Sequence, residues 1–434
     1  MSPKNNTIVI GAGISGLTAA YQLQKKGHDV LVLEAHESAG GRMATVNWEG
    51  FKVDVGAKFV TSSDKTLLEM VDEVGLTDQL VREGEGLTIT IYRDGKLHSA
   101  NFLNLLSYFS WSGVSLAARF AMLKLIPHFF PLLGFKDVYH LERNPLPDTE
   151  ETFEEFFKNK ISEEMFEYWA IPMFETMCSY SGKDVSRTAF LALMASYLNA
   201  DSVTFKEGIG ALPDAIAARL KVELGALVRG VEINRDGSGA QVRYTQGGSE
   251  KTITAPLVVV AVPGNHALKL FPDPRPAWKV FFPKVGYSSG ALHYHILETD
   301  YQPEVPGTMI PRALGLALNG ISFEAYQDGR WLLMTDPSHS HFIPGKSEKE
   351  YEKEALETAV KIYPQIEGTF RAHRLFAWDE KVPTFRPGYL DALAAFWADP
   401  QEGPVYFCGD YFAGPSTGGA LFTGLECVER IGKQ

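Results

Sequence analysis

Three glycines near the start of the chain constrain its fold more than any other feature of the sequence. The short apolar run Thr7–Ile10 predicts a buried strand, and it leads directly into Gly11, Gly13 and Gly16. The next ten residues have the pattern of a helix, and residues 28–34 predict a second strand. The glycines therefore lie at the turn of a predicted βαβ unit, which is typical of a Rossmann-like α/β domain.

The spacing of these glycines indicates a dinucleotide site. Gly11 allows a tight turn, Gly13 lets a phosphate approach the backbone, and Gly16 lets helix and strand pack closely. The N-terminus of the predicted helix offers unpaired N–H groups and the positive end of the helix dipole to an anion, and Ile14 and Ser15 are expected to contact the cofactor there. We therefore expect a pyrophosphate at this turn.

An acidic residue ends the second predicted strand. Glu34 lies 18 residues after Gly16. Its carboxylate can accept hydrogen bonds from both hydroxyls of an adenosine ribose, and it would repel a 2′-phosphate. We expect Glu34 and the adjacent Ala35 to contact the adenosine, and we expect NADP to be disfavoured.

Length and composition narrow the class of protein. A chain of 434 residues is too long for one ordinary core, so we expect two domains. A net charge of -12 without a basic block argues against nucleic acid as a partner. The three cysteines, Cys178, Cys408 and Cys427, exclude a disulfide scaffold, lack metal-ligand spacing and favour a reducing, cytoplasmic location. No secretory signal or transmembrane segment is predicted.

Two further stretches near the N-terminus carry a resemblance to a known family. Gly40-Gly41-Arg42 follows the second strand closely, and Asp54-Val-Gly56-Ala57 comes soon after. This region resembles the FAD-binding N-terminus of the flavin amine oxidase superfamily, which includes amine oxidases, protoporphyrinogen oxidases and phytoene-type desaturases. The resemblance implies FAD as cofactor, with Gly41 and Arg42 beside its phosphates and Gly56 and Ala57 close to the flavin ring.

The C-terminal part of the chain extends the resemblance to nearly its whole length. A predicted strand ends in Gly409-Asp410, and residues 414–420 lead into a last helix at residues 421–431. A helix N-terminus at the pyrimidine edge of the flavin would stabilise the negative charge of the reduced ring. The cofactor-binding residues that the resemblance implies beyond residue 200 are Val231, Trp378, Gly409, Asp410, Gly418, Gly419 and Ala420.

The predicted fold class is α/β: a Rossmann-like FAD-binding domain of the GR2 type with a discontinuous α+β substrate-binding domain. The FAD-binding domain is expected to comprise residues 1–75, 205–270 and 375–434, and the substrate-binding domain residues 76–204 and 271–374. The first segment of the substrate-binding domain is predicted to be mostly helical between residues 102 and 204. The second alternates predicted strands, at 291–297 and 330–335, with a helix at 349–362.

The resemblance implies an FAD-dependent oxidoreductase that takes a hydride from a small molecule onto flavin N5, with O2 as a candidate electron acceptor. Ser416 stands where amine oxidases have an aromatic cage residue, and Trp378 precedes a segment similar to protoporphyrinogen oxidases. We therefore expect dehydrogenation or desaturation of an apolar or anionic substrate. The alternatives are an amine or amino-acid oxidase, in which Lys279 or Lys284 would supply the lysine near N5, and a non-catalytic FAD-binding redox protein.

No cysteine occupies the segment through which some amine oxidases attach flavin, so FAD is expected to be non-covalent and Cys408 to be a core residue. Lys58, Phe59 and Arg386 are the candidates for the catalytic cavity. Lys58 could pair with a substrate carboxylate or stabilise reduced flavin, or it could be a solvated lysine at the cavity edge. Arg386 could serve the same anionic role.

Two other features have competing interpretations. His293 and His295 alternate on a predicted strand, so they share one face, and a polar surface is favoured over the cavity. No further residue is seen that would make them a metal site, and no metal is expected. Residues 102–135 are rich in apolar side chains but poor in Lys and Arg. Helices packed over the substrate cavity are favoured there over a peripheral membrane contact.

Overall fold

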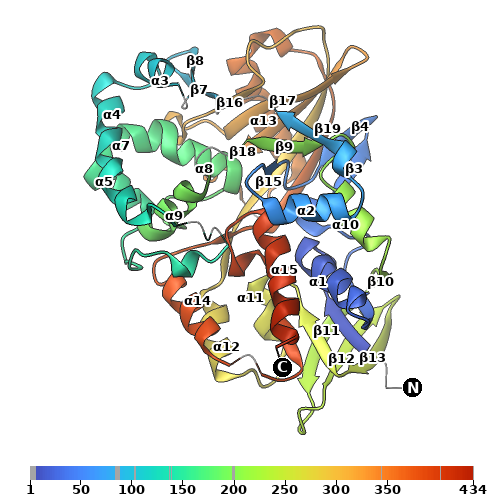
Figure 1. Cartoon of the computed structure of the whole chain (residues 1–434). Helices are drawn as coiled ribbons and strands as arrows, with labels where there is room; N and C mark the ends of the chain where they lie inside the picture. Colours follow the sequence, from blue (N-terminus) through green and yellow to red (C-terminus); the bar gives the residue numbers. More distant parts are fainter. Residues whose placement is uncertain are drawn as a thin grey trace.

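The computed structural model describes residues 6–83, 88–101, 104–135, 137, 139–197, 201–343, 345–400 and 402–433. Its elements form two main sheets with helices around them, and segments far apart in sequence meet in each sheet (Figure 1). Residues 102 and 103, at the start of the predicted apolar segment, lie outside the described residues.

A five-stranded parallel sheet contains the predicted N-terminal strand at its centre. Its order is β10-β2-β1-β14-β20, and every neighbouring pair is parallel. Strands that carry mostly Val, Ile and Leu suit a parallel sheet that is buried on both faces. The strands are β1 (Asn6–Ile10), β2 (Asp29–Leu33), β10 (Lys221–Glu223), β14 (Leu257–Val260) and β20 (Val405–Phe407).

Two helices from opposite ends of the chain pack against each other beside this sheet. They are α1 (Ile14–Lys25) and α15 (Thr417–Ile431), drawn in blue and red in Figure 1. A Cβ on Gly424 would lie 2.4 Å from the carbonyl oxygen of Ser15, so the glycine permits this close approach. The last helix begins at Thr417, four residues earlier than predicted, so Gly418, Gly419 and Ala420 lie in its first turn.

The described residues also form three small sheets. One of them is a three-stranded antiparallel sheet. These sheets contain β11 (Leu227–Ile233), β12 (Ala240–Gln246) and β13 (Ser249–Ala255); β3 (Thr45–Trp48) and β4 (Phe51–Asp54); and β5 (Val60–Thr61), β6 (Leu80–Glu83) and β9 (Ser202–Phe205).

A seven-stranded mixed sheet forms the second main layer, in the order β19-β15-β18-β17-β16-β7-β8. The predicted domain boundary between residues 374 and 375 falls inside its edge strand, β19, which continues to Thr384. The strands are β7 (Thr88–Arg93), β8 (Lys96–Asn101), β15 (Gly286–Glu298), β16 (Gly307–Met309), β17 (Leu318–Gln327), β18 (Arg330–Pro337) and β19 (Phe370–Thr384).

Short helices built around aromatic side chains lie beside this sheet (Figure 1). Phe153 and Phe190 stack with their centroids 4.4 Å apart, and Phe157, Phe166 and Phe174 surround them. The helices of this region are α3 (Leu105–Ser110), α4 (Leu116–Ala121), α5 (Ile126–Phe129), α6 (Phe153–Phe156), α7 (Glu163–Met165), α8 (Ile171–Cys178) and α9 (Arg187–Tyr197).

The remaining helices connect or cover the sheets. They are α2 (Lys65–Glu73), α10 (Ala211–Ala217), α11 (Gly264–Ala267), α12 (Pro276–Phe281), α13 (Glu348–Ile362) and α14 (Tyr389–Ala398). A capping box at Ser347 and Glu350 fixes the start of α13, close to its predicted start. Within the described residues, no helix combines the length and the apolar character that crossing a membrane requires.

Candidate active site

The glycine turn has the geometry that its spacing predicts. Gly11 has a φ of 105°, and its Cβ would lie 2.6 Å from the carbonyl oxygen of Ala261. A Cβ on Gly16 would meet the carbonyl oxygen of Gly11 at 2.1 Å. A Cβ on Gly13, by contrast, would have nothing within 4 Å, and α1 begins at the next residue without a side-chain cap. Open space and uncapped N–H groups therefore coincide, as a pyrophosphate requires.

Glu34 is held against this turn by backbone donors. Its carboxylate accepts hydrogen bonds from the N–H of Ala12 at 2.6 Å and from the N–H of His36 at 2.9 Å. The side chain is buried, whereas Ala35 is exposed. The start of the three-stranded sheet lies next to Glu34, because Ala226 donates its N–H to the Glu34 carbonyl at 2.7 Å.

Arg42 lies in the short turn Gly41–Met43, which follows Gly40. Gly40 donates its N–H to the Ala12 carbonyl at 2.8 Å, so this turn runs beside the glycine loop. The Arg42 guanidinium is 2.7 Å from a carboxylate oxygen of Asp410, and it donates to the Lys381 carbonyl at 3.1 Å. The structure therefore joins the N-terminal and C-terminal parts of the predicted site.

Gly56 and Ala57 pack against the same turn. A Cβ on Gly56 would meet the Arg42 carbonyl oxygen at 2.3 Å, and Ala57 donates its N–H to that oxygen at 2.9 Å. Trp378 reaches this segment from β19 and donates its Nε1–H to the Val55 carbonyl at 2.8 Å. Two nearby N-terminal segments thus meet a distant C-terminal strand where the flavin ring is expected.

The C-terminal residues complete the cluster. Thr423 accepts a hydrogen bond from the N–H of Gly409 and lies 3.0 Å from the hydroxyl of Ser15, so it links the last helix to the first. Ser416 caps that helix, because its hydroxyl accepts the N–H of Gly419 at 2.9 Å. The position expected for a cage aromatic therefore holds a helix cap. Val231 is buried in β11, opposite Val242 of β12, and its adenine contact stays a prediction.

Two of the three cavity candidates are already paired within the protein. Lys58 lies 2.5 Å from a carboxylate oxygen of Glu324, and its ammonium group also contacts the sulfur of Met334. Phe59 is 38% exposed and belongs to no buried cluster. Arg386 forms an ion pair with Asp184 at 2.8 Å. Neither cation is free in this arrangement.

Sequence reasoning missed a buried lysine. Lys279 and Lys284 were the candidates for the lysine near N5 in the amine-oxidase alternative, but Lys279 is half exposed and pairs with Asp273. The buried lysine is Lys381 on β19, which donates to the hydroxyl of Ser179 at 2.6 Å. Gly290 on β15 leaves room for it, because a Cβ there would meet Ser179 and the Lys381 chain. Sequence reasoning carried no signal for Lys381, because no strand was predicted around this residue.

Two buried carboxyl groups accompany Lys381. Asp336 at the end of β18 is fully buried, and its carboxylate lies 3.7 Å from the Lys381 ammonium group. Burial raises the pKa of Asp336 to about 6, against the attraction of Lys381. Burial likewise raises the pKa of Glu175 on α8 to about 7. Groups that titrate near neutral pH inside a protein are characteristic of functional sites.

The expectation for the two histidines on β15 was wrong. His293 and His295 are both buried, and burial lowers the pKa of His293 to about 3. The expectation that no further ligand accompanies them was also wrong. His373 and Glu348 lie beside His293. Among the described residues, these three form the one group of His, Cys, Asp or Glu side chains that is spaced closely enough to hold a metal ion.

Comparison with known proteins supports the same chemistry. The family model for flavin-containing amine oxidoreductases matches residues 14–432. Chloroplastic protoporphyrinogen oxidase 1 of Arabidopsis thaliana is 25% identical over 96% of this chain and 87% of its own length. Coproporphyrinogen III oxidase of Propionibacterium freudenreichii is 34% identical, but the match spans 21% of this chain and 17% of that protein.

The fold is shared with solved structures. A double mutant of putrescine oxidase superposes over the whole of both chains with a TM-score of 0.81 at 20% identity. The predicted α/β fold and the flavin cofactor are thereby confirmed. The family match over almost the whole chain decides its membership. The chain belongs to the flavin-containing amine oxidoreductase family and is an FAD-dependent oxidoreductase.

Proposed function

We propose that this protein dehydrogenates or desaturates an apolar or anionic small molecule, in the manner of protoporphyrinogen oxidases and related desaturases. The observation that carries the proposal is the role of Ser416. Its hydroxyl caps α15, so this position lacks the aromatic ring with which amine oxidases build their cage. A relative that aligns over most of both chains, a protoporphyrinogen oxidase, supports the same substrate class.

FAD would be held without a covalent bond and would accept a hydride equivalent at N5. The α1 N-terminus and Gly13 would bind the pyrophosphate, and Glu34 the adenosine ribose. Arg42 would neutralise phosphate charge from its ion pair with Asp410. Trp378 would back the ring, and Lys381 would present its positive charge from β19. We propose O2 as the electron acceptor.

One observation favours a second function, the oxidation of an amine. Neither carboxylate oxygen of Asp336 has a hydrogen-bond partner among the described residues, although the side chain is fully buried. A protonated amine could satisfy such a carboxylate. The buried Lys381 is also the type of residue that amine oxidases place near N5. Both features suit an amine substrate, whereas Ser416 argues against one.

The deciding experiment is anaerobic reduction of the purified yellow protein with a panel of substrates. The panel contains porphyrinogens, carotenoid precursors, amines and amino acids. Loss of flavin absorbance with a porphyrinogen or a carotenoid precursor would support the first function. Bleaching by an amine alone would replace it with the second. Flavin that resists every compound but is reduced by light would instead point to a non-catalytic redox protein.

We also propose a cytoplasmic protein that contacts a membrane surface through its described residues between 104 and 135. Trp111, Leu125 and Leu132 pack inward, but a set of large apolar side chains points outward. Arg119 and Lys124 are the charged residues between 104 and 135. Cosedimentation with anionic vesicles, lost on replacing Phe120 and Phe130 with Ser, would test the contact. The exposed set is Leu106, Leu116, Phe120, Leu123, Ile126, Phe130 and Leu133.

A further inference from the structure

Two histidines from neighbouring strands meet at the edge of the seven-stranded sheet. His293 lies on β15 and is fully buried, and His373 lies on the edge strand β19. In the register of these antiparallel strands, His293 is opposite Leu375, so His373 is its diagonal neighbour on the same face. The pairing of the strands therefore fixes how the two rings approach each other.

The ring nitrogens that face each other are spaced as metal ligands are. Nε2 of His293 lies 3.2 Å from Nδ1 of His373, and Nδ1 of His373 lies 3.6 Å from Oε1 of Glu348. One ligand atom from each of the three residues lies within 4.8 Å of the other two. Tetrahedral zinc with bonds of about 2.0–2.1 Å separates its ligand atoms by about 3.4 Å. The two shorter distances bracket that value.

A second carboxylate fixes the orientation of His373. Oε2 of Glu352 lies 3.1 Å from Nε2 of His373, so this carboxylate can hold the proton on Nε2. Nδ1 then presents its lone pair toward His293 and Glu348. A histidine that binds metal through one nitrogen and donates to a carboxylate through the other is the usual arrangement in metal sites.

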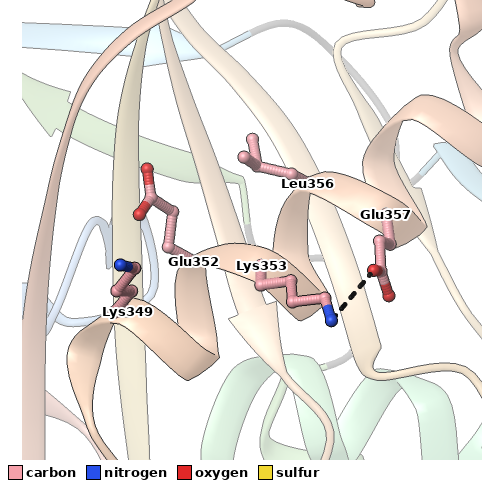
Figure 2. Close-up of a pocket in the computed structure, with 5 residues that line it drawn as sticks. All are labelled: Lys349, Glu352, Lys353, Leu356 and Glu357. Atoms are coloured by element: carbon pink, nitrogen blue, oxygen red, sulfur yellow. Dashed lines mark ion pairs between the residues drawn. The ribbon is translucent and has the colours of Figure 1, made fainter.

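The helix is also tied to the strand from which His373 projects. Glu348 is the first residue of α13, and its Oε1 accepts the backbone N–H of Leu375 at 2.8 Å. Figure 2 shows Glu352 pointing from α13 into an open hollow that Lys349, Lys353, Leu356 and Glu357 also line. The side chains of His373 and Glu348 are 28% and 48% exposed, so solvent and an ion can reach the outer side of the histidine pair.

We infer that His293, His373 and Glu348 form a binding site for one divalent transition-metal ion such as Zn2+. Two imidazoles and one carboxylate suit zinc, and water would complete a tetrahedral set. The ion would join the first turn of α13 to β15 and β19. Five residues of strand separate His373 from Trp378, about 17 Å at the usual rise. The metal site is therefore distinct from the flavin site, and its failure would leave the proposed function untouched.

Zinc binding is measured on the protein with its flavin bound, after treatment with EDTA and removal of the chelator. Titration calorimetry with ZnCl2 should show one site per chain. Glu352→Gln should weaken binding about 10- to 100-fold, as loss of an outer carboxylate does in other metal sites. His373→Gln and Glu348→Gln, which each remove a ligand, should weaken it further. His266→Gln is the matched control. The His266 ring also contacts a carboxylate, that of Glu380 at 2.6 Å, but it is not part of the proposed site, so zinc binding should not change.

A spectroscopic readout separates a metal site from a simple pair of hydrogen-bonded rings. Co2+ in a tetrahedral site adds visible bands beyond the flavin absorbance, and these bands should vanish in His373→Gln. Should that variant lose its flavin, Glu348→Gln, whose side chain is 48% exposed, carries the test. Absence of a stoichiometric zinc site in the native protein would overturn the inference. Equal zinc affinity in the native protein and both ligand variants would overturn it as well.

Discussion

The ammonium group of Lys381 on β19 lies 3.7 Å from Oδ1 of Asp336 on β18, and both side chains are buried. Removing one charge of a buried pair leaves the other without compensation, which costs about 3–5 kcal/mol. Lys381→Met should therefore lower the free energy of unfolding by about that amount at pH 8, where Asp336 is ionised. Adding Asp336→Asn should recover most of the loss in urea denaturation. If the changes in the free energy of unfolding caused by the two single substitutions simply add in the double variant, the two charges do not interact.

Glu175 should make stability depend on pH. Burial raises its pKa from 4.5 to about 7, so the folded state holds this proton more tightly than the unfolded chain does. Its contribution to stability is complete below pH 4.5 and is lost as the pH rises from 4.5 to 7. The difference corresponds to roughly 3 kcal/mol.

Glu175→Gln should remove this part of the pH dependence and raise the free energy of unfolding above pH 7. Urea denaturation between pH 4 and 8 measures the effect. Glu357→Gln, on the exposed face of α13, is the control and should leave the profile unchanged. An identical pH profile in Glu175→Gln would contradict the burial of an ionised carboxylate at this position.

Gly13 and Gly16 should respond differently to the same substitution. A Cβ fits the open space beside Gly13, so Gly13→Ala should fold but bind FAD poorly, because the methyl group takes the room of a phosphate. Gly16→Ala places its Cβ against the backbone of Gly11, so both stability and flavin content should fall. Thermal unfolding of the apoproteins and flavin content after reconstitution distinguish the two effects. Normal FAD affinity in Gly13→Ala would show that the phosphates do not bind beside Gly13.

Arg42 should contribute to cofactor affinity through its charge. A hydrogen bond to a charged group is worth about 1.5–3 kcal/mol, so Arg42→Ala should weaken FAD binding about 10- to 100-fold. Fluorescence titration of the apoprotein with FAD gives the affinity. Arg143→Ala removes an exposed arginine that also pairs with an aspartate, Asp137, and should bind FAD normally. Equal losses in the two variants would assign the effect to general electrostatics.

The parts of the site that the sequence predicts are those encoded locally. Gly11, Gly13 and Gly16 follow one strand within a few residues, and Glu34 ends the next, so spacing alone determines their relation. The approach of Arg42 to Asp410 could be expected only from the family resemblance, because 368 positions separate the two residues.

Residues whose roles depend on pairing between distant strands were not predictable. The burial of Lys381 depends on the absence of a side chain at Gly290, which lies on a different strand. Alternation of His293 and His295 indicated a shared face, but it could not show that their face is covered. His295 contacts Thr335 and His293 contacts His373, and both partners come from neighbouring strands. Sequence periodicity describes one strand and contains no information about what packs on it.

The position of β20 and α15 in the chain determines when the flavin site can form during synthesis. β14 lies between β1 and β20 in the parallel sheet, and β20 begins only at residue 405. α15, which contacts α1, leaves the ribosome later than β20. A nascent chain therefore exposes one edge of β14 and one face of α1 until both segments have been made. A chain truncated before residue 405 would present an uncovered apolar edge to chaperones and proteases.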